Sequence, residues 1–114
     1  MIQQALKSLS YDSSYLLLLL YSKDEDFFLI DVREDREWIQ GHILGAHHLG
    51  KGIIERDIGN LINNKESLIV LYCQGGYRSA LAGENIQKMG YKNVLSMSGG
   101  FSDWMLNNFP IDKP

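Results

Sequence analysis

The sequence contains a single cysteine, Cys73, and only two prolines among its 114 residues. One cysteine cannot form an intrachain disulfide, which excludes a small secreted domain held together by disulfides. The N-terminus lacks the basic flank, apolar stretch and cleavage site of a signal peptide. The leucine run at 16–20 is far shorter than the ~20 residues that span a bilayer. We therefore expect a cytoplasmic protein without a membrane partner, and we expect the leucine run to lie in the core.

The chain also lacks a large excess of either charge. Lys and Arg total 11 against 14 Asp and Glu, a formal net charge of −3, and no basic cluster stands out. This distribution does not favour nucleic acid as a partner. With 45% hydrophobic and 22% charged residues over 114 positions, the composition predicts one globular domain with a single core.

Apolar runs alternate with helix-like segments along the chain. Strands are predicted at residues 27–32, 46–49, 68–72 and 94–97, and helices at 34–40, 53–62, 79–89 and 101–106. Residues 2–21 are predicted to form one or two helical segments, with a possible break or cap at Ser13-Ser14. Strand runs this uniformly apolar are typical of parallel strands covered on both faces. The pattern predicts an α/β fold with a small, mostly parallel sheet and helices on both faces, followed by an irregular tail that contains Pro110 and Pro114.

The candidate catalytic residues directly follow the apolar run 68–72. Cys73 opens a glycine-rich loop whose remaining residues are Gln74, Gly75, Gly76, Tyr77, Arg78 and Ser79. Backbone N–H groups of such a turn, together with a helix N-terminus, place partial positive charge near the sulfur and favour its thiolate form. We therefore predict that Cys73 is a catalytic nucleophile, although most free cysteines are inert buried thiols.

The roles of three other loop residues are open at this point. The Arg78 guanidinium can stabilise a thiolate and attract an anionic donor, or it can tie the loop to neighbouring carboxylates. For Ser79, capping of the following helix is favoured over donation to the sulfur. Tyr77 is expected to project toward solvent or substrate.

Three sequence blocks in this order resemble the rhodanese family in its compact single-domain form. They are Asp31-Val32-Arg33-Glu34 with Glu37-Trp38 and the stretch 41–46, then the loop from Cys73 to Ser79, then Gly99-Gly100 with Trp104. The match extends over about residues 27–104 of a single domain, between an N-terminal helical segment at 1–26 and a tail at 107–114. Leu44 stands where the family usually has proline, so we expect a looser turn there.

The resemblance implies a rhodanese-like three-layer fold and a sulfurtransferase that moves a sulfane sulfur through a persulfide on Cys73. It implies a small-molecule sulfur donor and a thiol or cyanide acceptor, and no cofactor. As donors, thiosulfate, 3-mercaptopyruvate, glutathione persulfide and protein persulfides all stay open. Because the chain has no second cysteine, an external thiol must take the sulfur. The alternative is a non-catalytic or sulfur-carrier module that works with a sulfur-relay protein.

The resemblance also assigns roles to individual side chains. It implies that the residues from Gln74 to Ser79 bind the substrate, with Arg78 favoured for an active-site role. Asp31 and Arg33 are expected to brace the loops structurally, Glu37 and Trp38 to be helix and core residues, and Phe101 and Trp104 to lie in the core beneath the active-site loop.

Two competing site types are disfavoured. Cysteine-dependent phosphatases have a longer loop, whereas here only four residues separate Cys73 from Arg78, which predicts a cradle suited to one sulfur atom rather than a phosphate. A metal site is also not expected, because His47 and His48 are adjacent and would point to opposite faces of a strand. His42 is expected to form a hydrogen bond within its own turn.

Overall fold

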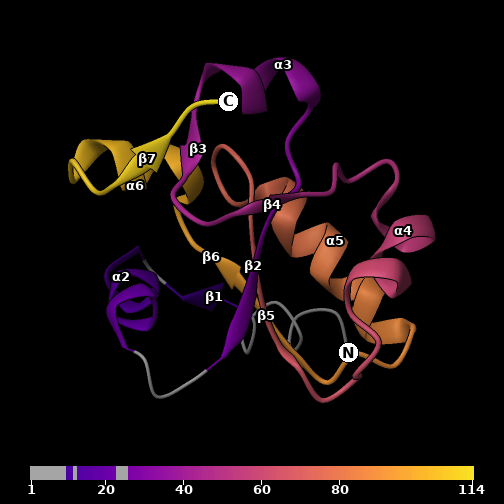
Figure 1. Ribbon diagram of the computed structural model, residues 1–114. Helices are drawn as coiled ribbons and strands as arrows, with labels where there is room; N and C mark the ends of the chain where they lie inside the picture. The colour runs from indigo at the N-terminus through magenta and orange to yellow at the C-terminus, as the bar shows by residue number, and fades with distance from the viewer. Residues whose placement is uncertain (1–9, 12, 23–25) are drawn as a thin grey trace.

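The computed structural model describes residues 10–11, 13–22 and 26–114, and its centre is a five-stranded parallel sheet (Figure 1). The strands lie in the order β1 (Ser10–Tyr11), β6 (Asn93–Met97), β5 (Leu68–Tyr72), β2 (Phe27–Asp31) and β4 (His47–His48). The pairing of β2 with β5 runs from Phe27 beside Leu68 to Asp31 beside Tyr72, so both strands end at the same edge. In open α/β sheets this carboxyl-terminal edge is where ligands bind.

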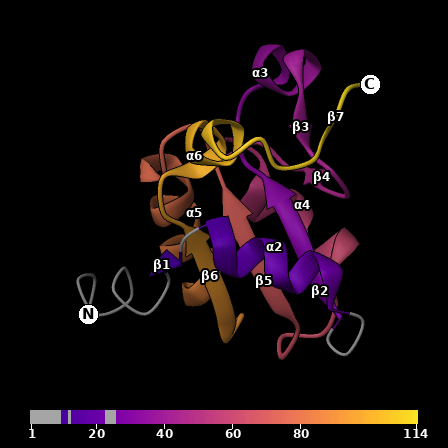
Figure 2. The ribbon, with the colours of Figure 1, turned by 90° about the vertical axis from the view of Figure 1, so that its left-hand side faces the viewer.

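Helices cover both faces of the sheet, as Figures 1 and 2 show together. α4 (Ile54–Leu61) and α5 (Tyr77–Lys88) lie on one face, and α2 (Ser13–Tyr21) and α6 (Gly100–Leu106) lie on the other. α3 (Asp35–Gln40) lies beyond the carboxyl-terminal edge. This confirms the predicted three-layer α/β arrangement around a mostly parallel sheet. Among the described residues, every helix is too short or too polar to cross a membrane.

The central strand β5 explains why the strand runs are uniformly apolar. Ile69, Leu71 and Cys73 belong to the core cluster beneath α4 and α5, whereas Val70 and Tyr72 belong to the cluster beneath α2 and α6. All five are at most 3% exposed. Because successive side chains of a strand point to opposite faces, a strand buried on both sides has no position for a polar residue.

The described N-terminal helix starts at the break or cap predicted at Ser13-Ser14, but the strand that precedes it was not predicted. Ser10–Tyr11 form the edge strand β1, which pairs in parallel with Ser96 and Met97 of β6, and α2 starts only at Ser13. Residues 2–9 and 12 of the predicted helical region lie outside the described residues. The leucine run lies in the core only in part, since Leu16 and Leu19 are core residues whereas Leu18 is 69% exposed.

The C-terminal tail is ordered against the segment that follows α3. β7 (Ile111–Asp112) pairs antiparallel with β3 (His42–Ile43), and neither strand was predicted. The Leu44 N–H donates to the carbonyl of Pro110 at 3.3 Å, and the Trp104 indole donates to the same carbonyl at 2.7 Å. A proline at position 44 has no N–H to donate. The expected loosening at Leu44 is therefore offset by a hydrogen bond to the tail.

Candidate active site

Cys73 directly follows β5 at the carboxyl-terminal edge of the sheet and is only 1% exposed. Its loop turns sharply at Gly76, which has φ of +104° and precedes α5. Only glycine adopts that conformation at little cost. The turn points the Gly76 N–H at the sulfur, with an N–S distance of 3.0 Å. The N-terminus of the twelve-residue helix α5 adds partial positive charge close to the sulfur.

The N-terminus of α6 holds the same loop. The Phe101 N–H donates to the carbonyl of Cys73 at 2.8 Å, and the Ser102 N–H donates to the carbonyl of Gln74 at 3.0 Å. Gly100 permits this close approach, because its φ is +57° and a Cβ there would lie 2.6 Å from the Gln74 carbonyl oxygen. Phe101 and Trp104, at 8% and 0% exposed, are core residues as predicted.

Asp31 and Arg33 brace the loop from the end of β2. The two residues are 0% and 2% exposed, and the guanidinium donates to both carboxylate oxygens at 2.8 to 3.1 Å. It also donates to the Gln74 side chain at 3.1 Å and to the Gly41 carbonyl at 2.6 Å, and it lies 4.2 Å from the Phe101 ring centroid. A buried ion pair with this many partners acts as a fixed strut. The Gln74 side chain is part of this strut, since its amide also donates to the Ser102 hydroxyl at 2.9 Å.

Arg78 ties the loop to a neighbouring carboxylate, which is the second of the two roles considered for it. Its two terminal nitrogens donate to the two carboxylate oxygens of Glu37, on α3, at 2.7 and 2.9 Å. These bonds lower the pKa of Glu37 to about 2, and the carboxylate in turn raises the pKa of Arg78. Glu37 is a helix residue as predicted but not a core residue, because its side chain is 24% exposed and faces the loop.

Ser79 lies inside α5 and does not cap it. The helix starts at Tyr77, two residues before the predicted start, and Gly76 is the N-cap. The buried Ser79 hydroxyl lies 3.6 Å from the Cys73 sulfur, donates to the Gly76 carbonyl at 3.1 Å, and lies 2.7 Å from the hydroxyl of Ser96 on β6. The sequence carries no local signal for Ser96, which reaches the site only because β6 lies beside β5.

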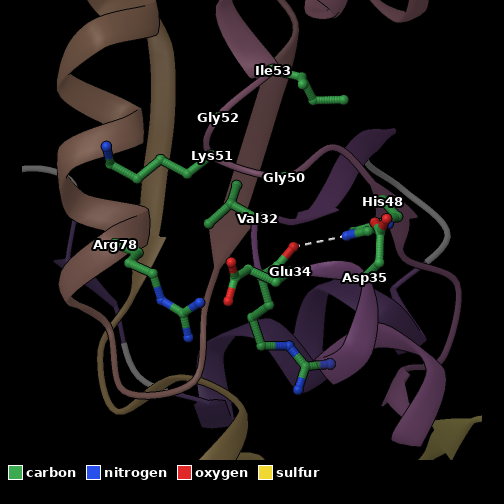
Figure 3. Close-up of a pocket in the computed structure, with 10 residues that line it drawn as sticks. Val32, Glu34, Asp35, His48, Gly50, Lys51, Gly52, Ile53 and Arg78 are labelled. Atoms are coloured by element: carbon green, nitrogen blue, oxygen red, sulfur yellow. Dashed lines mark hydrogen bonds and ion pairs between the residues drawn. The ribbon is translucent and has the colours of Figure 1, made fainter.

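Two clefts flank the loop. Arg78 lines the larger one, of about 660 Å³, which we call the large cleft; its other walls are the start of α3 and the segment 48–53 (Figure 3). The smaller one, of about 260 Å³, is lined by Gly75, Gly76, Tyr77 and Ser96 among others. Tyr77 is 77% exposed, as expected for a residue that projects from the loop.

His42 and His48 pack around Trp38, which is half-buried rather than a core residue. Its ring stacks on His42 at a centroid distance of 3.5 Å and on His48 at 4.8 Å. His42 contacts the Trp38 carbonyl at 3.3 Å, as expected for a bond within its turn, and His48 contacts the Arg33 carbonyl at 2.8 Å. Within the part of the chain that the structure describes, no three potential metal ligands come together.

Comparison with known proteins identifies the family. The sequence model of the rhodanese-like domain family matches residues 14–107, so the chain belongs to this family. It is 36% identical over 81 residues to the putative sulfur carrier protein YrkF of Bacillus subtilis, covering 71% of this chain and only 43% of YrkF. It is 32% identical over 90 residues to a sulfurtransferase of Allochromatium vinosum, covering 79% of this chain and 82% of that protein.

The fold has close counterparts among solved structures. The solution structure of the rhodanese-like domain of the Anabaena Alr3790 protein superposes with a TM-score of 0.82 at 23% identity, covering 93% of this chain and 80% of that one. At this identity the similarity establishes the fold, whereas the chemistry has to be argued from the loop itself.

Proposed function

We propose that this protein is a sulfurtransferase that carries a sulfane sulfur as a persulfide on Cys73. The observation that carries the proposal is the geometry of the loop, in which the sulfur accepts the Gly76 N–H at 3.0 Å beside the N-terminus of α5. The names of the two relatives, a sulfurtransferase and a putative sulfur carrier, support a sulfur-transfer role at the level of the family.

The first half-reaction loads the sulfur. The Cys73 thiolate attacks the outer sulfur of a donor such as thiosulfate, a new S–S bond forms, and the S–S bond of the donor breaks. Sulfite leaves with the electron pair of the broken bond, and the outer sulfur of the persulfide carries the negative charge. The Gly76 N–H and the partial charge of α5 stabilise this anion as they stabilise the thiolate.

The second half-reaction delivers the sulfur. A thiolate or cyanide attacks the outer sulfur, the S–S bond to Cys73 breaks, and Cys73 returns as thiolate. The loop backbone supplies the surroundings of the sulfur in both halves, because the Arg33 strut and the N-terminus of α6 hold it in one conformation.

The alternative is a sulfur-carrier module that receives sulfur from one protein and delivers it to another. The 36% identity to a putative sulfur carrier and the exposed Tyr77 beside the nucleophile favour this version. It retains the Cys73 persulfide, but a protein replaces the small molecule as donor and as acceptor. Slow loading by thiosulfate together with rapid loading by a cysteine desulfurase would support the carrier.

The test is the intact mass of the reduced protein before and after excess thiosulfate, with Cys73→Ser alongside. The expected result is a gain of one sulfur atom that dithiothreitol reverses and that the variant does not show. A gain that persists in Cys73→Ser would refute the persulfide on Cys73. No gain in either protein would remove thiosulfate as the donor, and the desulfurase arm would then decide.

A further inference from the structure

The large cleft raises a question about charge, because a donor such as thiosulfate is an anion whereas the residues around the loop are mostly paired. Arg78 is held by Glu37 at 2.7 Å, and Arg33 is held by Asp31 at 2.8 Å. Each of these cations is therefore neutralised by a carboxylate in direct contact. An anionic donor entering the cleft would gain little from them alone.

The two acidic residues that line the cleft, Glu34 and Asp35, are exposed to solvent. Glu34 contacts Arg36 at 3.1 Å, and Asp35 contacts His48 at 3.7 Å while its side chain is 94% exposed to solvent. An exposed carboxylate is screened by water and salt. The acidic side of the cleft therefore repels an anion only weakly.

Lys51 is a cation of the large cleft that has no carboxylate partner among the described residues. It lines the large cleft together with Arg78, and among the described residues no carboxylate lies within 4.0 Å of its ammonium. Figure 3 shows its side chain extending from the segment 50–53 toward α5, on the same side of the cleft as Arg78. Lys51 as a whole residue is half-buried.

The backbone fixes Lys51 at the end of β2, which is the neighbour of the nucleophile's strand β5. The Leu49 N–H donates to the Asp31 carbonyl at 3.1 Å, and the Lys51 N–H donates to the Val32 carbonyl at 2.9 Å, so this segment continues along the end of β2. The Val32 side chain belongs to the same core cluster as Cys73. The position of Lys51 relative to the loop is thus set by main-chain hydrogen bonds.

We propose that Lys51 is a substrate-binding residue that draws anionic sulfane-sulfur donors into the large cleft, a role that rests on the proposed function. It supplies the second positive charge that the active-site loop itself lacks, since Gln74 and Gly75 follow the nucleophile. The preferred donor is accordingly a small oxyanion-bearing molecule such as thiosulfate. A neutral donor or acceptor gains nothing from Lys51.

The experiment compares two alkylating reagents of similar size, anionic iodoacetate and neutral iodoacetamide, in their second-order rates with Cys73. We expect Lys51→Gln to slow iodoacetate about fivefold at low ionic strength and to leave the iodoacetamide rate unchanged. Lys51→Arg should keep the iodoacetate rate, and added salt should remove the difference. The same Lys51→Gln protein should need a correspondingly higher thiosulfate concentration for half-maximal loading.

Lys92→Gln is the matched control. It removes the same charge just before β6, where Lys92 contacts Glu66 at 3.0 Å. Lys92 lines no part of the large cleft, so the rates of this variant should equal those of the parent protein. An unchanged ratio of the two rates in Lys51→Gln would overturn the proposal, and so would an equal slowing of both reagents. If thiosulfate fails to load Cys73 but the ratio falls as expected, the anion role of Lys51 stands and the thiosulfate reaction is refuted.

Discussion

Gly100→Ala tests whether the contact between α6 and the active-site loop holds the loop in place. An alanine there must adopt φ of +57°, which costs about 1 kcal/mol for a residue with a Cβ. Its Cβ would also lie 2.6 Å from the Gln74 carbonyl oxygen, and it would overlap the Cys73 carbonyl oxygen as well. Since these are backbone atoms, the N-terminus of α6 has to move away from the loop.

This movement breaks the two hydrogen bonds from Phe101 and Ser102 to the loop carbonyls. At about 1 kcal/mol net for each bond, plus about 1 kcal/mol for the backbone conformation, we expect the free energy of unfolding to fall by about 3 kcal/mol. Urea denaturation with linear extrapolation measures this change. Gly75→Ala is the control, because no atom lies within 4 Å of a Cβ there and its φ is not positive. A loss below about 1 kcal/mol for Gly100→Ala would refute the reasoning.

Two further predictions concern side chains that contact the loop. The pKa of Glu37 is lowered from 4.5 to about 2 in the folded state, so its ion pair with Arg78 stabilises the fold above pH 4.5 and is lost as the pH falls toward 2. Glu37→Gln should therefore flatten the fall in the urea midpoint across this window, and an identical acid profile would contradict the pairing. Ser96→Ala removes one hydrogen-bond partner of the buried Ser79 hydroxyl and should lower the free energy of unfolding by about 1 kcal/mol. Because that hydroxyl lies 3.6 Å from the Cys73 sulfur, the variant should also slow iodoacetamide alkylation of Cys73. Ser98→Ala, exposed in the same small cleft, should do neither, and equal effects of the two variants would contradict the role of Ser96.

The sequence by itself determined the features that short-range patterns encode. The run 68–72 is a strand with the predicted bounds, because a strand buried on both faces must be apolar at every position. Cys73, the glycine turn and the following helix are contiguous in the chain, so their local order already defines the loop. The spacing of the three blocks that contain Asp31, Cys73 and Gly99 was enough to indicate the family.

The tertiary structure alone decided which distant residues surround that loop. Arg78 and Glu37 are 41 positions apart, and Ser79 and Ser96 are 17 apart, so no local periodicity relates them. The strands β1, β3 and β7 have two residues each, too few to show an alternating pattern, and form because a partner strand supplies their hydrogen bonds. Lys51 reaches the large cleft for the same reason, since main-chain pairing with the end of β2 places it there. Local sequence defines the nucleophile and its loop, whereas its surroundings depend on long-range packing.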